Sequence, residues 1–161
     1  MDIKEIDSLP CIRFVTERDL DRILEIERLS FPSPHQWNYY DFKAALKDLF
    51  FVFEEKEKIL GFLIACCYEG EDRAIIMRIA VDPEYRGKGI ATMLIEVTLE
   101  TLRKMNIGEV ELDVEIVRTG AIKLYEKIGF KIVKPLHMNN EENEDFYIMK
   151  LKLDIERREA A

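Results

Sequence analysis

The sequence predicts a single α/β (α+β) domain in which strands and helices alternate along the chain. Residues 75–81 form an apolar run of strand length, and after a loop with two glycines, residues 90–105 carry apolar side chains at the spacing of one helix face. In residues 109–114 charged and apolar side chains alternate, as in a strand with one buried face. The length of 161 residues suits one domain over residues 1–161.

Composition and charge exclude several classes of protein. The chain is 48% apolar and 35% charged, as in soluble globular proteins, and its longest apolar run, residues 59–68, is too short to cross a membrane. The first residues lack the layout of a signal peptide, so we expect a cytoplasmic protein. The net charge of −8 argues against nucleic acid as a partner and is compatible with a cationic substrate such as an amine.

Cysteine and histidine do not have the spacing of a metal site. Cys11 stands alone, Cys66 and Cys67 are adjacent in an apolar run, and the histidines are His35 and His137. No metal is therefore expected. We interpret the three cysteines as reduced core residues.

The other elements follow from the same patterns. The remaining expected strands are residues 11–15, 50–54, 59–68, 131–133 and 146–153, and the remaining expected helices are residues 16–29, 38–49 and 120–128. Thr16 and Asp19 have the spacing of a capping box at the start of the first helix. Glu27 falls on the apolar face of that helix, which leaves two interpretations open. The carboxylate is either buried with a partner, or lies at the edge of the face and reaches solvent.

The loop between residues 81 and 90 has the features of a diphosphate-binding site. Gly87 and Gly89 lack a Cβ atom, so the backbone can bend sharply and approach a ligand closely. The loop leads into a helix whose first amides have no partner within the helix, and such a terminus attracts anions. Arg86 and Lys88 add positive charge beside it.

Two well-known phosphate-binding motifs do not fit this loop. A Walker loop requires glycine where this chain has Asp82 and Ser or Thr where it has Gly89, and a dinucleotide fingerprint requires glycine where it has Thr92. The segment Arg86-x-x-Gly89-x-Ala91 instead resembles the Arg/Gln-x-x-Gly-x-Gly/Ala signature of the GNAT acetyltransferase superfamily. In that superfamily this loop holds the pyrophosphate of acetyl-coenzyme A (acetyl-CoA).

Two further segments strengthen the resemblance. Residues 124–130, Leu-Tyr-Glu-Lys-Ile-Gly-Phe, are similar to the Leu-Tyr-x-x-x-Gly-Phe segment of the superfamily. Residues 26–31, Ile-Glu-Arg-Leu-Ser-Phe, with Trp37 soon after, resemble the Ile-Glu-x-x-Ser-Phe-x-x-x-Trp segment of the RimI-type N-terminal acetyltransferases. The order of strands and helices fits the superfamily over about residues 11–153, which are the expected core.

The resemblance implies the GNAT fold, a mixed and mostly antiparallel sheet with splayed central strands and helices on both faces. In this fold the pantetheine arm of the cofactor lies between the strand that ends at Val81 and the strand that starts at Glu109. The acceptor amine enters from the other side, near residues 30–37. The resemblance implies cofactor contacts at Ile79, Ala80, Val81, Arg86, Gly87, Lys88, Gly89, Ile90, Ala91, Thr92, Arg118 and Tyr125, and substrate contacts at Glu27, Phe31 and Trp37.

The implied reaction is attack of an amine on the acetyl thioester in a ternary complex, which calls for an acid and a base. Tyr125 matches the family tyrosine near the cofactor sulfur and is the expected acid, the alternative being that it is only a core residue. Asp113 falls where RimI-type enzymes carry an acidic or histidine residue and is a candidate base, or else one carboxylate of a solvated strand face. Glu27 is the other candidate carboxylate. Arg118 departs from the family, which usually has Asn there.

Three functions therefore remain open at this stage. The resemblance favours transfer of acetyl from acetyl-CoA to the N-terminal α-amine of a protein or peptide. A small-amine acetyltransferase, acting on a polyamine or an amino acid, is the second, and the acidic residues 139–145 suit a polycation. A non-catalytic acyl-CoA-binding module is the third, and only Arg118 and the short Asp113 side chain favour it. The acceptor, the acyl-chain specificity and the oligomeric state do not follow from the sequence.

Overall fold

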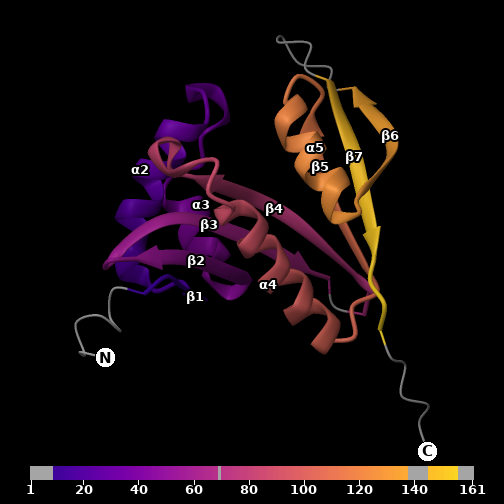
Figure 1. Cartoon of the computed structure of the whole chain (residues 1–161), viewed down its shortest axis with the longest axis horizontal. Coiled ribbons are helices and arrows are strands. Elements are labelled where there is room, and N and C mark those ends of the chain that lie inside the picture. Colours follow the sequence, from indigo (N-terminus) through magenta and orange to yellow (C-terminus); the bar gives the residue numbers. More distant parts are fainter. Residues whose placement is uncertain (1–8, 69, 138–144, 156–161) are drawn as a thin grey trace, which may run out of the picture. The chain divides into compact units, whose positions relative to one another are not determined.

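The structure is a computed structural model that describes residues 9–68, 70–137 and 145–155. Within these residues seven strands form one sheet in the order β1-β2-β3-β4-β5-β7-β6 (Figure 1). The strands are β1 Cys11–Phe14, β2 Leu49–Glu55, β3 Lys58–Cys67, β4 Arg73–Val81, β5 Glu109–Glu115, β6 Lys131–His137 and β7 Asp145–Lys152. The β4–β5 pair is parallel, whereas the β1–β2, β2–β3, β5–β7 and β6–β7 pairs are antiparallel. The predicted mixed, mostly antiparallel sheet is confirmed.

Four α-helices and four short 3-10 turns accompany these strands in the described residues. The helices are α2 Leu20–Ser30, α3 Tyr39–Ala44, α4 Ile90–Lys104 and α5 Thr119–Ile128. The 3-10 turns are η1 Glu17–Asp19, η2 Ser33–His35, η3 Ala45–Lys47 and η4 Pro83–Tyr85. None of these helices combines the length and the apolar character that crossing a membrane requires.

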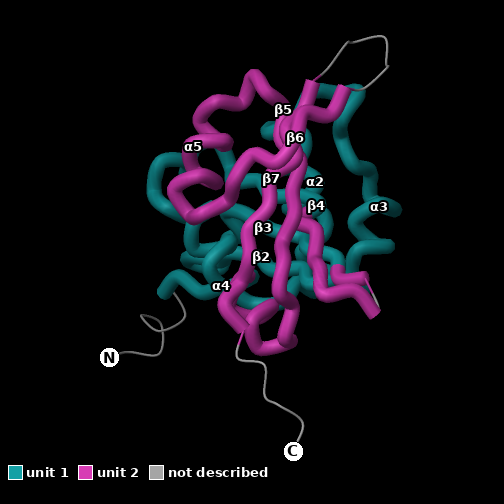
Figure 2. Tube along the Cα trace, turned by 90° about the vertical axis from the view of Figure 1, so that its right-hand side faces the viewer, with its two compact units in different colours: residues 1–66, 77–98 teal, residues 67–76, 99–161 magenta. Residues whose placement is uncertain are grey.

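The chain divides into two compact units (Figure 2). Unit 1 comprises residues 1–66 and 77–98, and unit 2 comprises residues 67–76 and 99–161, so that β4 and α4 contribute to both. The parallel pairing of β4 with β5 lies in unit 2 and joins only residues 73–75 to residues 109–111. A single domain over residues 1–161 stays a prediction.

In unit 1, α2 and α3 pack on one face of β2 and β3. Their buried core consists of Leu20, Ile23, Ile26, Phe42, Ala45, Phe50, Val52, Ile59, Phe62, Ile64 and Ala80. Gly61 points away from this core, because side chains alternate along a strand. A Cβ atom on Gly61 would lie 3.0 Å from the Ala80 carbonyl oxygen and 3.3 Å from Ile90 Cγ2. The first residue of α4 therefore packs closely on the other face of β3, where only glycine leaves enough space.

The predicted capping box of Thr16 and Asp19 is present, at the start of the 3-10 turn η1 that leads into α2. The backbone N–H and the hydroxyl of Thr16 donate to Asp19 Oδ2 at 2.6 and 3.0 Å. Arg13 of β1 adds two charge-assisted bonds, from Nη1 to Oδ2 at 2.8 Å and from Nη2 to Oδ1 at 3.0 Å. Burial alone would raise the pKa of Asp19, but the bonds from Arg13 and Thr16 outweigh it and lower this pKa below the usual value.

In unit 2, β5 has the predicted alternation. Val110, Leu112 and Val114 are buried, whereas Asp113 on the opposite face is exposed. β7 pairs with all seven residues of β5 and also with β6. α5 ends at Ile128; the next residue, Gly129, has a φ of 124°, and the N–H of Phe130 donates to the Tyr125 carbonyl oxygen at 3.0 Å.

Some element boundaries differ from the prediction because strand pairing overrides local periodicity. The helix predicted over residues 38–49 ends at Ala44, and Leu49 instead begins β2 and pairs with Ala65. β6 extends past residue 133 to His137, because β7 supplies partners up to Asp145. Met105, which was expected on the apolar face of α4, lies beyond the last helical residue and is 47% exposed.

The interpretation of the cysteines as core residues is wrong. Cys11 is exposed on β1, and Cys66 and Cys67 are half-buried at the end of β3. None of the three described cysteines forms a disulfide, in agreement with the expected reduced thiols. β1 is an edge strand of the sheet, which explains the exposure of Cys11.

Asp19→Asn should lower the free energy of unfolding at pH 7 by about 1–2 kcal/mol, because it removes one charge of the Arg13 pair. The pKa of Asp19 is lower in the folded than in the unfolded chain. Its stabilisation is therefore complete above the usual Asp pKa of about 4 and is lost as the pH falls through the folded value. In urea titrations the parent should thus lose more stability than the variant on acidification.

The matched control for this experiment is Glu17→Gln, in the same turn. The Glu17 side chain is 62% exposed, so its replacement should change the free energy of unfolding by less than about 0.5 kcal/mol. Equal acid sensitivity of the parent and Asp19→Asn would contradict the assignment of Asp19 as a stabilising carboxylate.

Candidate functional site

The loop between β4 and α4 has the backbone that its glycines predict. Gly87 and Gly89 have φ angles of 79° and 81°, in the region that favours glycine, and both residues are exposed. The Gly89 carbonyl oxygen accepts the first bond of α4, from the Met93 N–H at 3.0 Å. The amides that precede Met93 have no partner within the helix, so this end of α4 suits an anion.

The two basic side chains of this loop play different parts. Arg86 folds back, and its Nε donates to the Val81 carbonyl oxygen at 3.0 Å while Nη2 donates to Ser30 Oγ at 3.2 Å. Lys88 is exposed, with its ammonium 5.2 Å from the centre of the Tyr85 ring. Arg86 therefore braces the loop against the end of β4 and the last residue of α2, in addition to supplying charge.

A buried carboxylate at the start of the loop was not singled out from the sequence. Asp82 is 4% exposed and accepts from Arg22 Nη2 at 2.5 Å and from the Glu84 N–H at 3.0 Å. Arg22 also donates from Nε to the Ile59 carbonyl oxygen at 2.9 Å. Burial alone would raise the pKa of Asp82, but the bonds from Arg22 and Glu84 lower it. An Asp before Pro signals a turn, whereas nothing in the sequence links it to Arg22 of α2.

Glu27 of α2 is fully buried and paired, so the interpretation in which its carboxylate reaches solvent is wrong. Arg78 of β4 holds it with two bonds, from Nε to Oε1 at 3.1 Å and from Nη2 to Oε2. The Trp37 backbone N–H donates to Oε2 at 2.9 Å. Arg78 was not predicted as a site residue. The sequence could have pointed to Arg78, because it is the single cation in the apolar run of residues 75–81.

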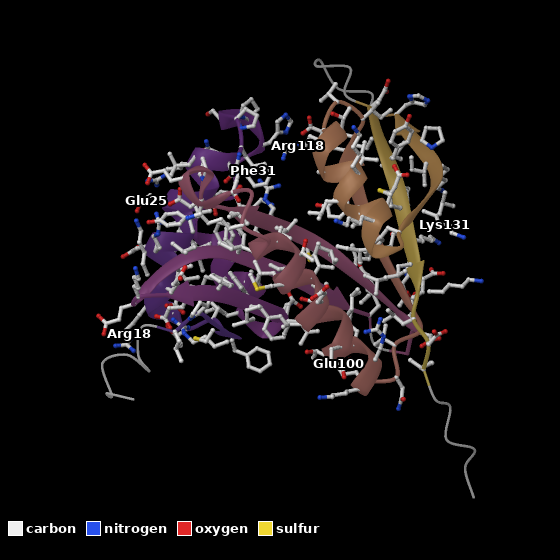
Figure 3. The ribbon with its side chains drawn as sticks, in the orientation of Figure 1. Arg18, Glu25, Phe31, Glu100, Arg118 and Lys131 are labelled. Atoms are coloured by element: carbon white, nitrogen blue, oxygen red, sulfur yellow. The ribbon has the colours of Figure 1, made fainter. Side chains whose placement is uncertain are left out.

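The guanidinium of Arg78 also organises the loop after α2. It lies 3.7 Å from the centre of the Phe31 ring and 5.5 Å from the Trp37 ring, both within the range of cation–π attraction. Its Nη2 donates to the His35 carbonyl oxygen at 2.7 Å. Phe31, labelled in Figure 3, lies directly after α2. The three residues predicted to contact substrate, Glu27, Phe31 and Trp37, are thus brought together around one arginine.

In unit 2, the charges of Asp113 and Arg118 act on Tyr125. Tyr125 of α5 is 8% exposed, with its ring 6.0 Å from that of Phe130. Burial raises the pKa of Tyr125 to about 12; the positive charge of Arg118 opposes this rise, and the negative charge of Asp113 adds to it. Arg118, labelled in Figure 3, precedes the first residue of α5. The phenol is therefore protonated at neutral pH and can act as a proton donor.

The predicted site residues thus form two groups. Unit 1 contains Glu27, Phe31, Trp37 and the predicted cofactor contacts of residues 79–92, and unit 2 contains Asp113, Arg118 and Tyr125. Within each unit the structure brings the predicted residues into one neighbourhood. The catalytic and binding roles of these residues stay predictions.

Comparison with known proteins gives the family of this chain. The profile of the acetyltransferase (GNAT) family matches residues 20–130. An N-alpha-acetyltransferase of Sulfurisphaera tokodaii is 32% identical over 152 residues, which cover 86% of this chain and 90% of that protein. An N-alpha-acetyltransferase of Saccharolobus solfataricus is 34% identical over 145 residues, covering 81% of this chain and 86% of that protein.

A solved structure agrees with these relatives. The crystal structure of the ribosomal-protein-S18-alanine N-acetyltransferase from Escherichia coli matches with a TM-score of 0.83 and 25% identity, over 95% of this chain and 99% of that one. The sheet order, the glycine loop before α4 and the family match over residues 20–130 lead to the same conclusion. This chain belongs to the GNAT family of acetyltransferases.

Proposed function

We propose that this protein transfers the acetyl group of acetyl-CoA to the α-amino group at the N-terminus of a protein or peptide, in the cytoplasm. The observation that carries the proposal is the agreement between the relatives and unit 1. The relatives from Sulfurisphaera tokodaii and Saccharolobus solfataricus, 32% and 34% identical to this chain, are N-alpha-acetyltransferases. The segment that resembles the RimI type, with Glu27, Phe31 and Trp37, forms one connected cluster in the structure.

The loop of residues 86–92 supplies the cofactor site in this proposal. The positive φ angles of Gly87 and Gly89 expose backbone N–H groups at the start of α4, where a diphosphate is stabilised. Lys88 adds charge on the exposed side. Residues 79–81 of β4 offer backbone groups to the pantetheine arm, and Arg86 keeps Val81 at the end of the strand through its bond to the Val81 carbonyl oxygen.

The chemistry requires the acceptor ammonium to lose a proton before its lone pair attacks the thioester carbonyl carbon. The carbon–sulfur bond then breaks, and the leaving thiolate takes up a proton. Asp113 is the proposed base and Tyr125 the proposed acid. The contacts of Glu27 favour Asp113, because both oxygens of Glu27 already accept bonds from Arg78 and Trp37.

The experiment that tests the function is mass spectrometry of a mixed pool of amines after incubation with the protein and acetyl-CoA. The pool contains peptides varied at their first two residues, lysine peptides with blocked N-termini, and polyamines. A gain of one acetyl group on free peptide N-termini is the expected outcome. Acetylation of polyamines alone would replace the proposal by the small-amine function, and tight acetyl-CoA binding without any product would indicate a binding module.

Tyr125→Phe should lower kcat by roughly a hundredfold, in the range of general acid catalysis, with little change in the KM for acetyl-CoA. A tyrosine phenol is protonated at neutral pH, and burial, which raises the pKa of Tyr125 to about 12, keeps it so; the variant therefore loses a proton donor that every wild-type molecule has. Steady-state kinetics measure the effect. The matched control is Tyr40→Phe, at a side chain that is 76% exposed, where kcat should stay unchanged. A loss of less than threefold in Tyr125→Phe would rule out the acid role.

The pH dependence of kcat/KM separates the two carboxylates. A base must be deprotonated to act, so activity rises with pH through the pKa of the base and gives the acidic limb of the profile. We expect Asp113→Asn to lose this limb and Glu27→Gln to retain it. Loss of the limb in Glu27→Gln alone would reverse the assignment, and its retention in both variants would exclude both carboxylates.

A further inference from the structure

Arg78 has contacts that the proposed reaction does not use. It lies on β4, and its guanidinium bonds to α2 through Glu27 and to the loop of residues 31–37 through His35. We infer that Arg78 is a positioning residue, which holds the loop of residues 31–37 in place for the acceptor, and that Glu27 acts through Arg78 rather than on the substrate. The inference rests on the proposed function only where it names the acceptor.

The burial of the pair shows that its geometry is fixed. The Glu27 side chain has no exposed surface and the Arg78 side chain is 15% exposed. The two parallel bonds between the guanidinium and the carboxylate form the fork that arginine makes and lysine cannot. A third bond, from the Trp37 N–H, completes the coordination of Oε2. A carboxylate held in this way has a structural partner at each oxygen.

The loop depends on the same guanidinium at three points along its length. Arg78 stacks on the Phe31 ring at its start, donates to the His35 carbonyl oxygen in its middle and lies 5.5 Å from the Trp37 ring at its end. The loop contains two prolines and one turn of 3-10 helix, so it has few backbone bonds of its own. Its other described bonds include Gln36 Nε2 to the Phe31 carbonyl oxygen at 2.8 Å. Removal of the cation therefore takes from each ring the contact that ties it to β4, while both rings keep their packing against the core of unit 1.

The structure also offers a second arginine as a contrast. Arg22 of α2 pairs with Asp82 at the start of the β4–α4 loop, and the two side chains are 17% and 5% exposed. This pair resembles Glu27–Arg78 in burial, but it supports the proposed cofactor loop. Each pair holds a different loop. Loss of the Glu27–Arg78 pair should therefore change the KM for the acceptor, and loss of the Arg22–Asp82 pair should change the KM for acetyl-CoA.

The test compares the acceptor KM and the acetyl-CoA KM in Arg78→Gln, Arg78→Lys and the double variant Glu27→Gln/Arg78→Gln. We expect the acceptor KM to rise about tenfold or more in Arg78→Gln and in the double variant, with the acetyl-CoA KM changed less than threefold. Arg78→Lys keeps the positive charge but cannot form two parallel bonds, so its acceptor KM should lie between those of the wild type and Arg78→Gln. Arg22→Gln should show the opposite split, with the larger change in the acetyl-CoA KM.

The double variant keeps the test decisive if Arg78→Gln does not fold. Removal of one partner leaves a buried carboxylate unpaired, whereas replacement of both by neutral amides leaves no charge behind. The control for a merely weakened fold is Arg13→Gln, which breaks the Arg13 pair with Asp19 and Glu54 and should move neither KM. Thermal melting of each variant checks that the comparison is made on folded protein.

Trp37 gives a readout that does not depend on turnover, because it is the single tryptophan of the chain. Its emission reports the environment of the loop directly. In the double variant we expect a red shift and stronger quenching by iodide, and in Arg13→Gln no change. A folded double variant with the wild-type Trp37 emission and acceptor KM would overturn the inference.

These readouts also separate the inference from the proposed function. If the wild type acetylates no peptide N-terminus, the proposed function fails, and Trp37 emission still decides whether Arg78 positions the loop. If the wild type acetylates peptides and Glu27→Gln removes the acidic limb of the pH profile without moving Trp37 emission, Glu27 is the base and the inference is wrong.

Discussion

The ion pair between Glu27 and Arg78 is the interaction on which the arrangement of unit 1 depends most. Loss of one partner from such a buried pair costs about 3–5 kcal/mol, because the remaining charge stays buried without compensation. The pair therefore fixes the register of α2 on β4. A slip of the helix by one turn, about 5.4 Å, would leave both charges in an apolar environment. The apolar residues of α2 could pack in several registers, but the ion pair permits one.

The same helix also orders the loop that follows β4. Arg22 holds Asp82 at the start of the loop, and Ser30 at the end of α2 accepts from Arg86. The contacts of α2 therefore reach β4 at Arg78 and its loop at two further places. The loop contains the single 3-10 turn η4 and two positive-φ glycines, so these side-chain bonds hold its two ends against α2. The helix that builds the core thus also shapes the anion site.

The sequence predicted the elements well where one side of each element faces the core. The apolar period of α4, the alternation in β5 and the capping box of Thr16 and Asp19 are local patterns, and the structure confirms them. Glu27 was placed on the apolar face of its helix, but the sequence left open whether its carboxylate is buried, and its partner could not be chosen. Arg78 lies 51 residues away, and only the folding of β4 beside α2 brings the two together.

The wrong predictions also arise where a residue's contacts come from parts of the chain that are distant in the sequence. The helix predicted through Leu49 stops early because β2 takes that residue into the sheet, and a pairing partner on another strand leaves no local signal. The apolar neighbours of Cys66 and Cys67 suggested core positions, yet burial depends on what covers a strand end. For Arg86 the sequence indicated the charge, and only the structure showed that two of its nitrogens bond within unit 1.

The three groups of unit 2 suggest how the two proton transfers of the proposed reaction are coupled. The negative charge of Asp113 raises the pKa of Tyr125, and the positive charge of Arg118 opposes this. If Asp113 is the base, as proposed, it becomes neutral when it accepts the proton of the acceptor ammonium, and its contribution to the pKa of Tyr125 disappears. Tyr125 then becomes a stronger acid under the remaining charge of Arg118, at the stage when the leaving thiolate needs a proton. In a chain with asparagine at position 118 this opposing charge would be absent, so the departure from the family pattern at Arg118 favours proton donation by Tyr125.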